Sequence, residues 1–325
     1  MLDTPPLKRS RVFLVAMAMV GVLCISMSPI FIRFADVPAA YAAFFRAIYA
    51  LPILATQIMV QYLIRYRGNK KKRTASVVEI GALWYPSGRV VAIAICSGML
   101  LAGDLSFWHR SIGLIGAGLA TLIGNSQVIF VSLFAAVFLG EKVPLRIIPL
   151  LGLIFFGGWL ALGMPAVRGS ASHVSMAWLG FFFSIVAAIF YSVFLLSMRR
   201  IRVGIDIMSA SMLFWLSVGT AGGASIAMLF DQPHQSIGFG RPHLWLLCVA
   251  IFAQVLGWQI LSYALPRLRT YIASTLLVTQ PVLSMTWGWL LCGETLVGTQ
   301  LLGFIVVLVA ISLMMIPKDA APAST

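Results

Sequence analysis

The sequence predicts an all-α polytopic membrane protein with ten transmembrane helices, arranged as two inverted five-helix repeats. Three observations lead to this fold class. The 325 residues are 61% hydrophobic and only 10% charged, with a mean hydropathy of +0.99, far outside the composition of soluble proteins. Apolar stretches long enough to cross a bilayer fill nearly the whole chain. The basic residues gather at alternate ends of those stretches.

A membrane span needs about 20 mainly apolar residues, and the chain offers ten such stretches. We expect spans at 12–33, 40–64, 90–110, 115–138, 146–163, 176–198, 207–230, 243–265, 269–292 and 298–316. The connections are too short to hold a soluble domain. Lys8, Arg9 and Arg11 precede the first span as in a signal peptide. That span is too long, however, and a second follows almost at once, which indicates an uncleaved anchor.

The net charge of +14 reports topology. Eighteen of the 23 basic residues fall on the face that also holds both termini, and Arg46 falls inside the second span. The opposite face holds only four, which are Arg33, Arg110, Arg168 and Arg241. This positive-inside bias predicts cytoplasmic N- and C-termini and accounts for the basicity without a nucleic-acid partner. The basic residues of 65–73 should attract anionic lipid headgroups, at about 1 kcal/mol each.

An odd number of spans in each set of five places the second set upside-down relative to the first. We therefore divide the chain into a cytoplasmic tail 1–11, a first repeat 12–163, a second repeat 176–316 and a cytoplasmic tail 317–325. The rare polar positions support this division. A single offset of 153 residues aligns Gln127 with Gln280, Glu141 with Glu294, Ala120 with Ala273 and Thr121 with Ser274.

These same residues carry a resemblance to a known family. Two copies of a helix with mid-membrane polar residues, each followed by Gly-Glu and a Leu-Leu-Gly helix, resemble the EamA-type drug/metabolite transporter superfamily over residues 12–316. The stretch 102–112, with Gly116-Ala117-Gly118, is similar to the third and fourth helices of bacterial members. The family often has a proline after the mid-helix polar residue. Pro281 matches it, but Val128 replaces it in the first copy, which puts a hinge there in doubt.

The resemblance implies a carrier with a central cavity between the repeats, most often an exporter of small organic molecules in a bacterial inner membrane. It leaves the substrate open, with an amino-acid-like or amphiphilic metabolite or drug as the expectation. Five-helix repeats can close a cavity within one chain, so a monomer suffices and the oligomeric state stays open.

Arg46 and Asp104 are the two clear charges within spans, where an ionisable residue is expensive and therefore a functional candidate. Each is expected six residues from the outer end of its helix, or about 9 Å, so an ion pair between them is plausible. That pair could lock two helices together, or both side chains could face the cavity. Arg46 would suit a carboxylate, and Asp104 is a candidate for proton exchange. Arg46 could also extend to the outer interface.

Further candidates for the substrate path are polar or aromatic residues within spans. Trp108 shares a helix face with Asp104 and could stack on a substrate, or anchor its helix at the interface. His109 could relay protons or lie at headgroup level. The others could line the cavity or join helices; they are Asn125, Gln127, Tyr191, Gln254, Trp258 and Gln280. Glu141 and Glu294 are expected to cap helices or pair with basic neighbours.

The four cysteines have no metal-ligand spacing and are expected to pack among apolar neighbours. Neither a metal nor another cofactor is expected. Without a Gly-rich lysine motif for phosphates, a secondary carrier is the leading hypothesis and ATP-driven transport is not expected. One alternative is a membrane enzyme, with Asp231, His234 and His243 as its only plausible corner. The other is a non-transporting scaffold or sensor that uses the loop between the second and third spans.

Overall fold

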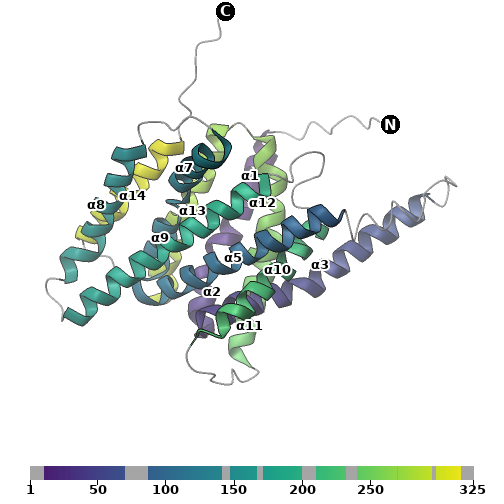
Figure 1. Cartoon of the computed structure of the whole chain (residues 1–325), viewed down its shortest axis with the longest axis horizontal. Coiled ribbons are helices and arrows are strands. Elements are labelled where there is room, and N and C mark those ends of the chain that lie inside the picture. The colour runs from purple at the N-terminus through teal and green to yellow at the C-terminus, as the bar shows by residue number, and fades with distance from the viewer. Residues whose placement is uncertain are drawn as a thin grey trace, which may run out of the picture.

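The computed structural model describes residues 11–69, 87–140, 147–166, 171–199, 210–231, 240–268, 270–294 and 298–315. Within these ranges the chain is helical and contains no strand (Figure 1). The expected tails other than Arg11, the basic run Lys70–Arg73, Glu141 and His234 lie outside them.

Each expected span coincides with helical structure. The first half contains α1 (Arg11–Ser26), α2 (Ser28–Ala35), α3 (Ala39–Asn69), α5 (Gly88–Ile115), α6 (Ala117–Gly124), α7 (Gln127–Leu139) and α8 (Ile147–Ala166). The second half contains α9 (Ala171–Arg199), α10 (Ala210–Met228), α11 (Arg241–Cys248), η1 (Val249–Gly257), α12 (Trp258–Ala264), η2 (Leu265–Arg267), α13 (Thr270–Cys292) and α14 (Gly298–Met315).

Seven helical stretches in the described part of the chain are long and apolar enough to cross a membrane. They are Val12–Ala35, Ala39–Ile64, Gly88–Ile115, Ala117–Phe138, Ser175–Met198, Ala210–Met228 and Arg241–Ala264. Two further apolar helices are shorter, Ile148–Ala161 and Gly298–Leu313. The chain is therefore a multi-pass membrane protein.

Several expected spans are divided into shorter helices by their own residues. Pro29, within the first two positions of α2, separates α2 from α1 at Met27. The expected span 115–138 is interrupted between α6 and α7, although Val128 stands where the second half has a proline. The amide of Asn125 donates to the Thr121 carbonyl at 2.8 Å, a local bond that competes with the helix ladder. By contrast, α13 continues through Pro281.

The two aligned Gly-Glu sequences have the same backbone conformation at their glycines. Gly140 follows α7 with φ 68°, and Gly293 follows α13 with φ 66°. A left-handed residue closes a helix, and glycine adopts this conformation without a steric penalty. Each copy of the Gly-Glu sequence therefore marks the end of a helix.

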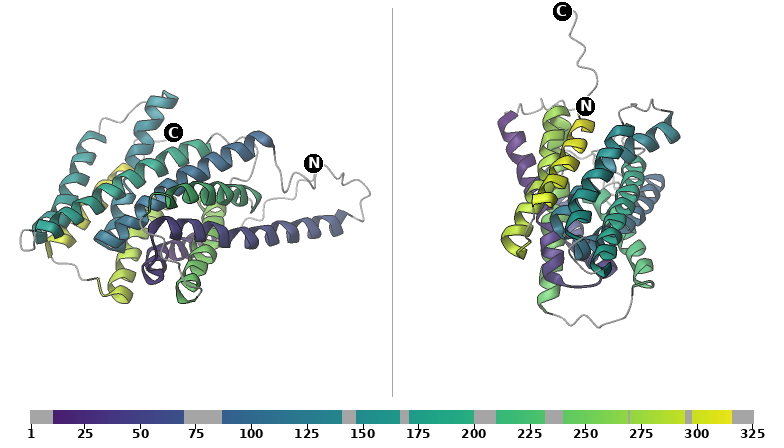
Figure 2. Two further views of the ribbon diagram at one scale, coloured as in Figure 1. Left: turned by 60° about the horizontal axis from the view of Figure 1, so that its bottom comes forward. Right: turned by 90° about the vertical axis from the view of Figure 1, so that its left-hand side faces the viewer.

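Helices from the two halves pack against one another throughout the bundle. α3 contacts α10, α6 contacts α13, and α8 lies beside α14 (Figure 1). α5 contacts α9 and α10, while α1 contacts η1, α12 and α13. The largest apolar core joins α3, α5, α9, α10 and η1, so the charged positions of α3 and α5 lie inside the densest part of the bundle. α1 begins and α14 ends at the same end of the molecule, at the top of Figure 1 and of the right panel of Figure 2.

Candidate functional site

Arg46 is buried in the core, with 4% of its surface exposed. Its Nε donates a 2.8 Å hydrogen bond to Gln254 Oε1, and its Nη1 lies 3.5 Å from Ser28 Oγ. Gln254 Nε2 in turn lies 3.5 Å from Ser217 Oγ. The guanidinium is thus held by residues of α2 and η1 inside the bundle, and Ser217 of α10 contacts the Gln254 amide in turn. The Nη2 atom donates no hydrogen bond to any residue that the structure describes.

The segment that carries Gln254 is a π-helix, Val249–Gly257. π-helical turns are rare and are frequent at functional sites, because the wider turn redirects a side chain out of the regular pattern. Gln254 is fully buried. Its amide oxygen accepts the hydrogen bond of Arg46 Nε. Without this acceptor, a charged donor would be unpaired within the bundle.

Asp104 lies on α5 and is partly exposed within the bundle. Among the described residues, its carboxylate takes part in neither a hydrogen bond nor an ion pair. It interacts electrostatically with Arg46 and with Tyr191 of α9. Arg46, Asp104 and Tyr191 therefore form a polar group that is contributed by three helices.

The expected contact between Arg46 and Asp104 is not formed, since no ion pair within 4.0 Å joins them. Asp104 does not lie six residues from the end of its helix as expected, because α5 continues to Ile115. Asp104 is eleven residues from that end, whereas Arg46 is seven residues from Ala39 at the start of α3. At 1.5 Å per residue the difference is about 6 Å along the helix. Arg46 instead takes its partners from Gln254 and Ser28.

An aromatic cluster lies beside the charged group. The ring of Tyr191 is 6.2 Å from that of Trp258 and 5.2 Å from that of Phe194. Phe194 and Trp258 meet edge to face at 6.1 Å. Two residues expected from separate helices, Tyr191 and Trp258, are thus brought together as one apolar wall next to the arginine and the carboxylate.

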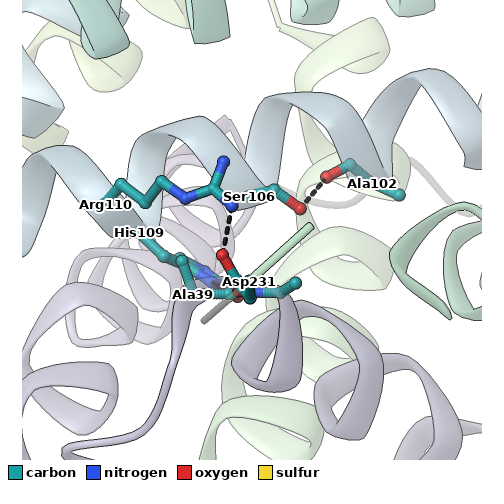
Figure 3. Close-up of polar contacts among 7 residues, drawn as sticks. Ala39, Ala102, Ser106, His109, Arg110 and Asp231 are labelled. Atoms are coloured by element: carbon teal, nitrogen blue, oxygen red, sulfur yellow. Dashed lines mark hydrogen bonds and ion pairs between the residues drawn. The ribbon is translucent and has the colours of Figure 1, made fainter. Parts of the chain in front are cut away.

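Trp108 and His109 are both buried inside the bundle. Trp108 is 9% exposed and packs beside Gly124 of α6. His109 is 4% exposed, and its Nδ1 lies 3.1 Å from the Ala39 carbonyl, so Nδ1 carries the proton and donates. Its Nε2 is buried without a hydrogen-bond partner among the described residues. Figure 3 shows His109 next to Ala39.

The remaining candidates are partly exposed within the bundle. Asn125 uses its side chain to bond the Thr121 carbonyl. The backbone carbonyl of Gln127 accepts from Ser192 Oγ at 3.0 Å, and its side chain is partly exposed, as is that of Gln280.

The proposed enzymatic corner is used for helix contacts. Asp231 forms an ion pair with Arg110 (Figure 3) and accepts the Ala40 backbone N–H at 2.9 Å. His243 Nδ1 lies 2.6 Å from the Tyr49 hydroxyl. Within the described ranges, no three His, Cys, Asp or Glu residues form a group that could hold a metal ion. The four cysteines have free thiols.

Sequence reasoning missed Ser28 and Ser217, the hydroxyl partners of the Arg46–Gln254 pair. Small hydroxyl residues are frequent in apolar helices and carry no distinctive signal. It also missed that Arg33 pairs with Glu294 and Arg110 with Asp231. Charges at span ends were visible, but which ends meet depends on how the helices pack.

Replacing Gln254 by leucine is expected to lower the free energy of unfolding by about 1.5–3 kcal/mol, the range for hydrogen bonds to charged groups. Arg46 Nε would lose its 2.8 Å acceptor inside the bundle. Thermal unfolding in detergent measures the change. Gln259→Leu is the matched control, because it breaks a neutral amide pair with Gln57, with bonds of about 0.6 kcal/mol each. Equal shifts for the two variants would contradict the role of Gln254.

The comparisons with known proteins agree with this architecture. The family model described as "EamA-like transporter family" matches residues 178–316. One solved structure, described only as "Crystal structure of protein", superposes with a TM-score of 0.55 at 15% identity, covering 94% of this chain and 98% of that one. At that identity the likeness shows a shared fold alone. No curated protein matches the sequence.

The resemblance inferred from the sequence is thus confirmed over residues 178–316, which match the model of the EamA-like transporter family.

Proposed function

We propose that the chain is a secondary carrier that exports a small organic metabolite by alternating access. The observation that supports this most directly is the buried Arg46, held by Gln254 and Ser28 beside Asp104, whose carboxylate forms no ion pair with any residue that the structure describes. A buried charged group in a membrane bundle is costly and marks a substrate or ion path. Here the arginine is anchored through Nε and Nη1, so Nη2 is left for a ligand.

The substrate class follows from the chemistry of this group. Arg46 offers a planar donor that suits a carboxylate. Asp104 offers an acceptor that suits an ammonium group, and the wall of Tyr191, Phe194 and Trp258 suits an apolar or aromatic body. The three together favour an amphiphilic zwitterion of amino-acid size. Trp108, Asn125, Gln127 and Gln280 are proposed to line the rest of the path.

We infer that residues 12–163 and 176–316 form two inverted five-helix repeats around this site. The packing supports it, because equivalent helices face each other across the halves in the pairs α3–α10, α6–α13 and α8–α14. The contacts of α5 with α9 are likewise mirrored by those of α12 with α1. Alternating access would then be a rocking of one repeat against the other.

The positive-inside distribution supports cytoplasmic tails at 1–11 and 317–325, and a bacterial inner membrane is the proposed location. Export rests on the family resemblance. Asp104 and His109 are proposed to exchange the coupling proton, because both are ionisable groups within the bundle that lack a full set of partners. The basic residues of 65–73 are proposed to bind anionic headgroups.

The external medium of bacteria that express the chain tests the proposal. Cells with the intact chain are expected to release one or a few compounds at a level at least tenfold above cells with Arg46→Ala at equal membrane abundance. Arg241→Ala is the matched control, because it removes an exposed arginine of α11 and should leave release unchanged. Identical media for the intact chain and Arg46→Ala would contradict export of a cell metabolite through this site.

A further inference from the structure

Two turns of the first half offer the same pair of donors at the same spacing. Arg33, near the end of α2, precedes the Ala40 N–H in the first turn of α3 by seven residues. Arg110, near the end of α5, precedes the Ala117 N–H at the start of α6, also by seven residues. Each turn therefore presents one guanidinium and one helix N-terminus, and an N-terminus attracts negative charge.

Two carboxylates of the second half each bind one donor from one turn and one donor from the other turn. Glu294 pairs with Arg33 at 2.5 Å and accepts the Ala117 N–H at 2.9 Å. Asp231 pairs with Arg110 and accepts the Ala40 N–H at 2.9 Å. Each acid thus joins the arginine of one turn to the helix start of the other. Figure 3 shows the Arg110–Asp231 contact at the end of α5.

The surrounding chain is shaped to fit Glu294. A Cβ added at Gly116 would lie 3.0 Å from the Glu294 carboxyl atoms, and one added at Gly288 would lie 2.4 Å from Oε2. Gly116 also has a φ of 85°, which a larger residue adopts only with strain. Neighbouring space remains in a hollow of about 210 Å³ lined by Arg33, Gly116, Glu294 and five other residues.

Both contacts are sheltered enough to hold the helices. The side chains of Glu294 and Asp231 are 17% and 11% exposed, while Arg33 and Arg110 are 42% and 28% exposed. Charge-assisted bonds in partly buried places are stronger than surface ion pairs, which contribute little. The two arginines are exposed enough to separate from their carboxylates, because water can solvate a guanidinium that has lost its ion-pair partner.

We propose that these crosswise contacts, Arg33–Glu294–Ala117 and Arg110–Asp231–Ala40, are two latches that hold one end of the bundle closed. The inference rests on the proposed carrier function, in which the halves move relative to each other. Every bond in the two latches joins the first half to the second, at the end where the α2–α3 and α5–α6 turns lie. A substrate crosses that end only after both latches break.

Cysteine labelling tests the latches without a substrate. The reporter is Ser28→Cys, 3.5 Å from Arg46, in a chain whose four native cysteines are replaced by alanine. A membrane-impermeant maleimide is applied to right-side-out and to inside-out vesicles. Asp231→Asn combined with Glu294→Gln is expected to raise labelling from the latch side at least tenfold, a shift of about 1.4 kcal/mol, and to lower labelling from the other side.

The single variants keep the side-chain shapes and should each give a smaller rise from the latch side. Asp36→Asn is the control, because it removes an exposed carboxylate from the same α2–α3 turn without breaking a latch. Unchanged labelling in the double variant, or an equal rise from both sides, would overturn the proposal. Labelling needs no substrate, so it tests the latches separately from transport. If the double variant gave the expected rise in labelling but the intact chain exported nothing, the carrier function would be refuted and the latch proposal would stand.

Discussion

Gly219→Val is expected to prevent the chain from folding into a stable bundle. A Cβ at Gly219 would lie 2.1 Å from the Ile95 carbonyl oxygen, and one at Gly98 would lie 2.2 Å from the Leu216 carbonyl oxygen. The backbones of α5 and α10 therefore touch at this crossing, as small residues allow in membrane helices. The clash is with backbone, which cannot turn aside, so the expected loss is about 3 kcal/mol or more.

Gly222→Val, three residues away on the same helix, is the matched control, because a Cβ there meets nothing within 4 Å. The fraction of monodisperse protein after detergent extraction, together with its thermal midpoint, measures both variants. Gly222→Val should resemble the parent, whereas Gly219→Val should be lost to aggregation. Equal recovery of the two would mean that α5 and α10 do not cross as closely as described.

This crossing also positions the candidate site. Gly98 lies on α5, six residues before Asp104, and Gly219 lies on α10, two residues after Ser217. A shift of α10 would move Ser217 away from Gln254 and so release the support of Arg46. Gly98→Ala would place its Cβ 2.2 Å from the Leu216 carbonyl oxygen, so it too is expected to push α5 and α10 apart and to impair transport in whatever fraction of the protein still folds.

Asp104→Asn is expected to abolish proton-driven accumulation of the substrate. The carboxyl of Asp104 has no hydrogen-bond or ion-pair partner among the described residues, and in the proposed mechanism it binds and releases a proton as the site opens to either side. An amide of the same shape cannot do this. In proteoliposomes with an imposed pH gradient, accumulation should fall at least tenfold, while exchange of substrate for substrate should persist.

Asp36→Asn serves as the control for the loss of one negative charge, since Asp36 is exposed at the end of α2. It should accumulate substrate as the parent does. If Asp104→Asn kept the full response to the pH gradient, Asp104 would not carry the coupling proton, and His109 would be the remaining candidate.

Each apolar stretch expected from hydropathy coincides with helical structure in the described part of the chain, because the bilayer requires long apolar stretches whatever their packing. Doubled Gly-Glu positions likewise located two helix ends with the same left-handed glycine. The neighbours of Arg46 were not predictable. They depend on the extra length of α5 beyond residue 110, on a π-helical turn at Gln254 and on Ser28, the first residue of α2 after the break at Met27. None of these has a signal in a pattern based on regular helices.

For Glu294 too, the sequence predicted the kind of contact but not the partner. Glu294 was expected to cap the following helix or pair with a basic neighbour, and it does pair and cap. The helix it caps, however, is α6, in the other half of the chain. Such a contact depends on how the two halves pack, which pairs residues 177 positions apart in the sequence.

Substrate counterflow decides whether the chain is a carrier that works by alternating access. Proteoliposomes are loaded with the unlabelled compound identified from the medium, diluted, and given a trace of the labelled compound outside. A carrier returns with labelled substrate after each outward trip, so the label should rise transiently above its equilibrium level inside, and Arg46→Ala should show no such rise. Labelled substrate that never exceeds equilibrium in liposomes with the intact chain would contradict alternating access through this site.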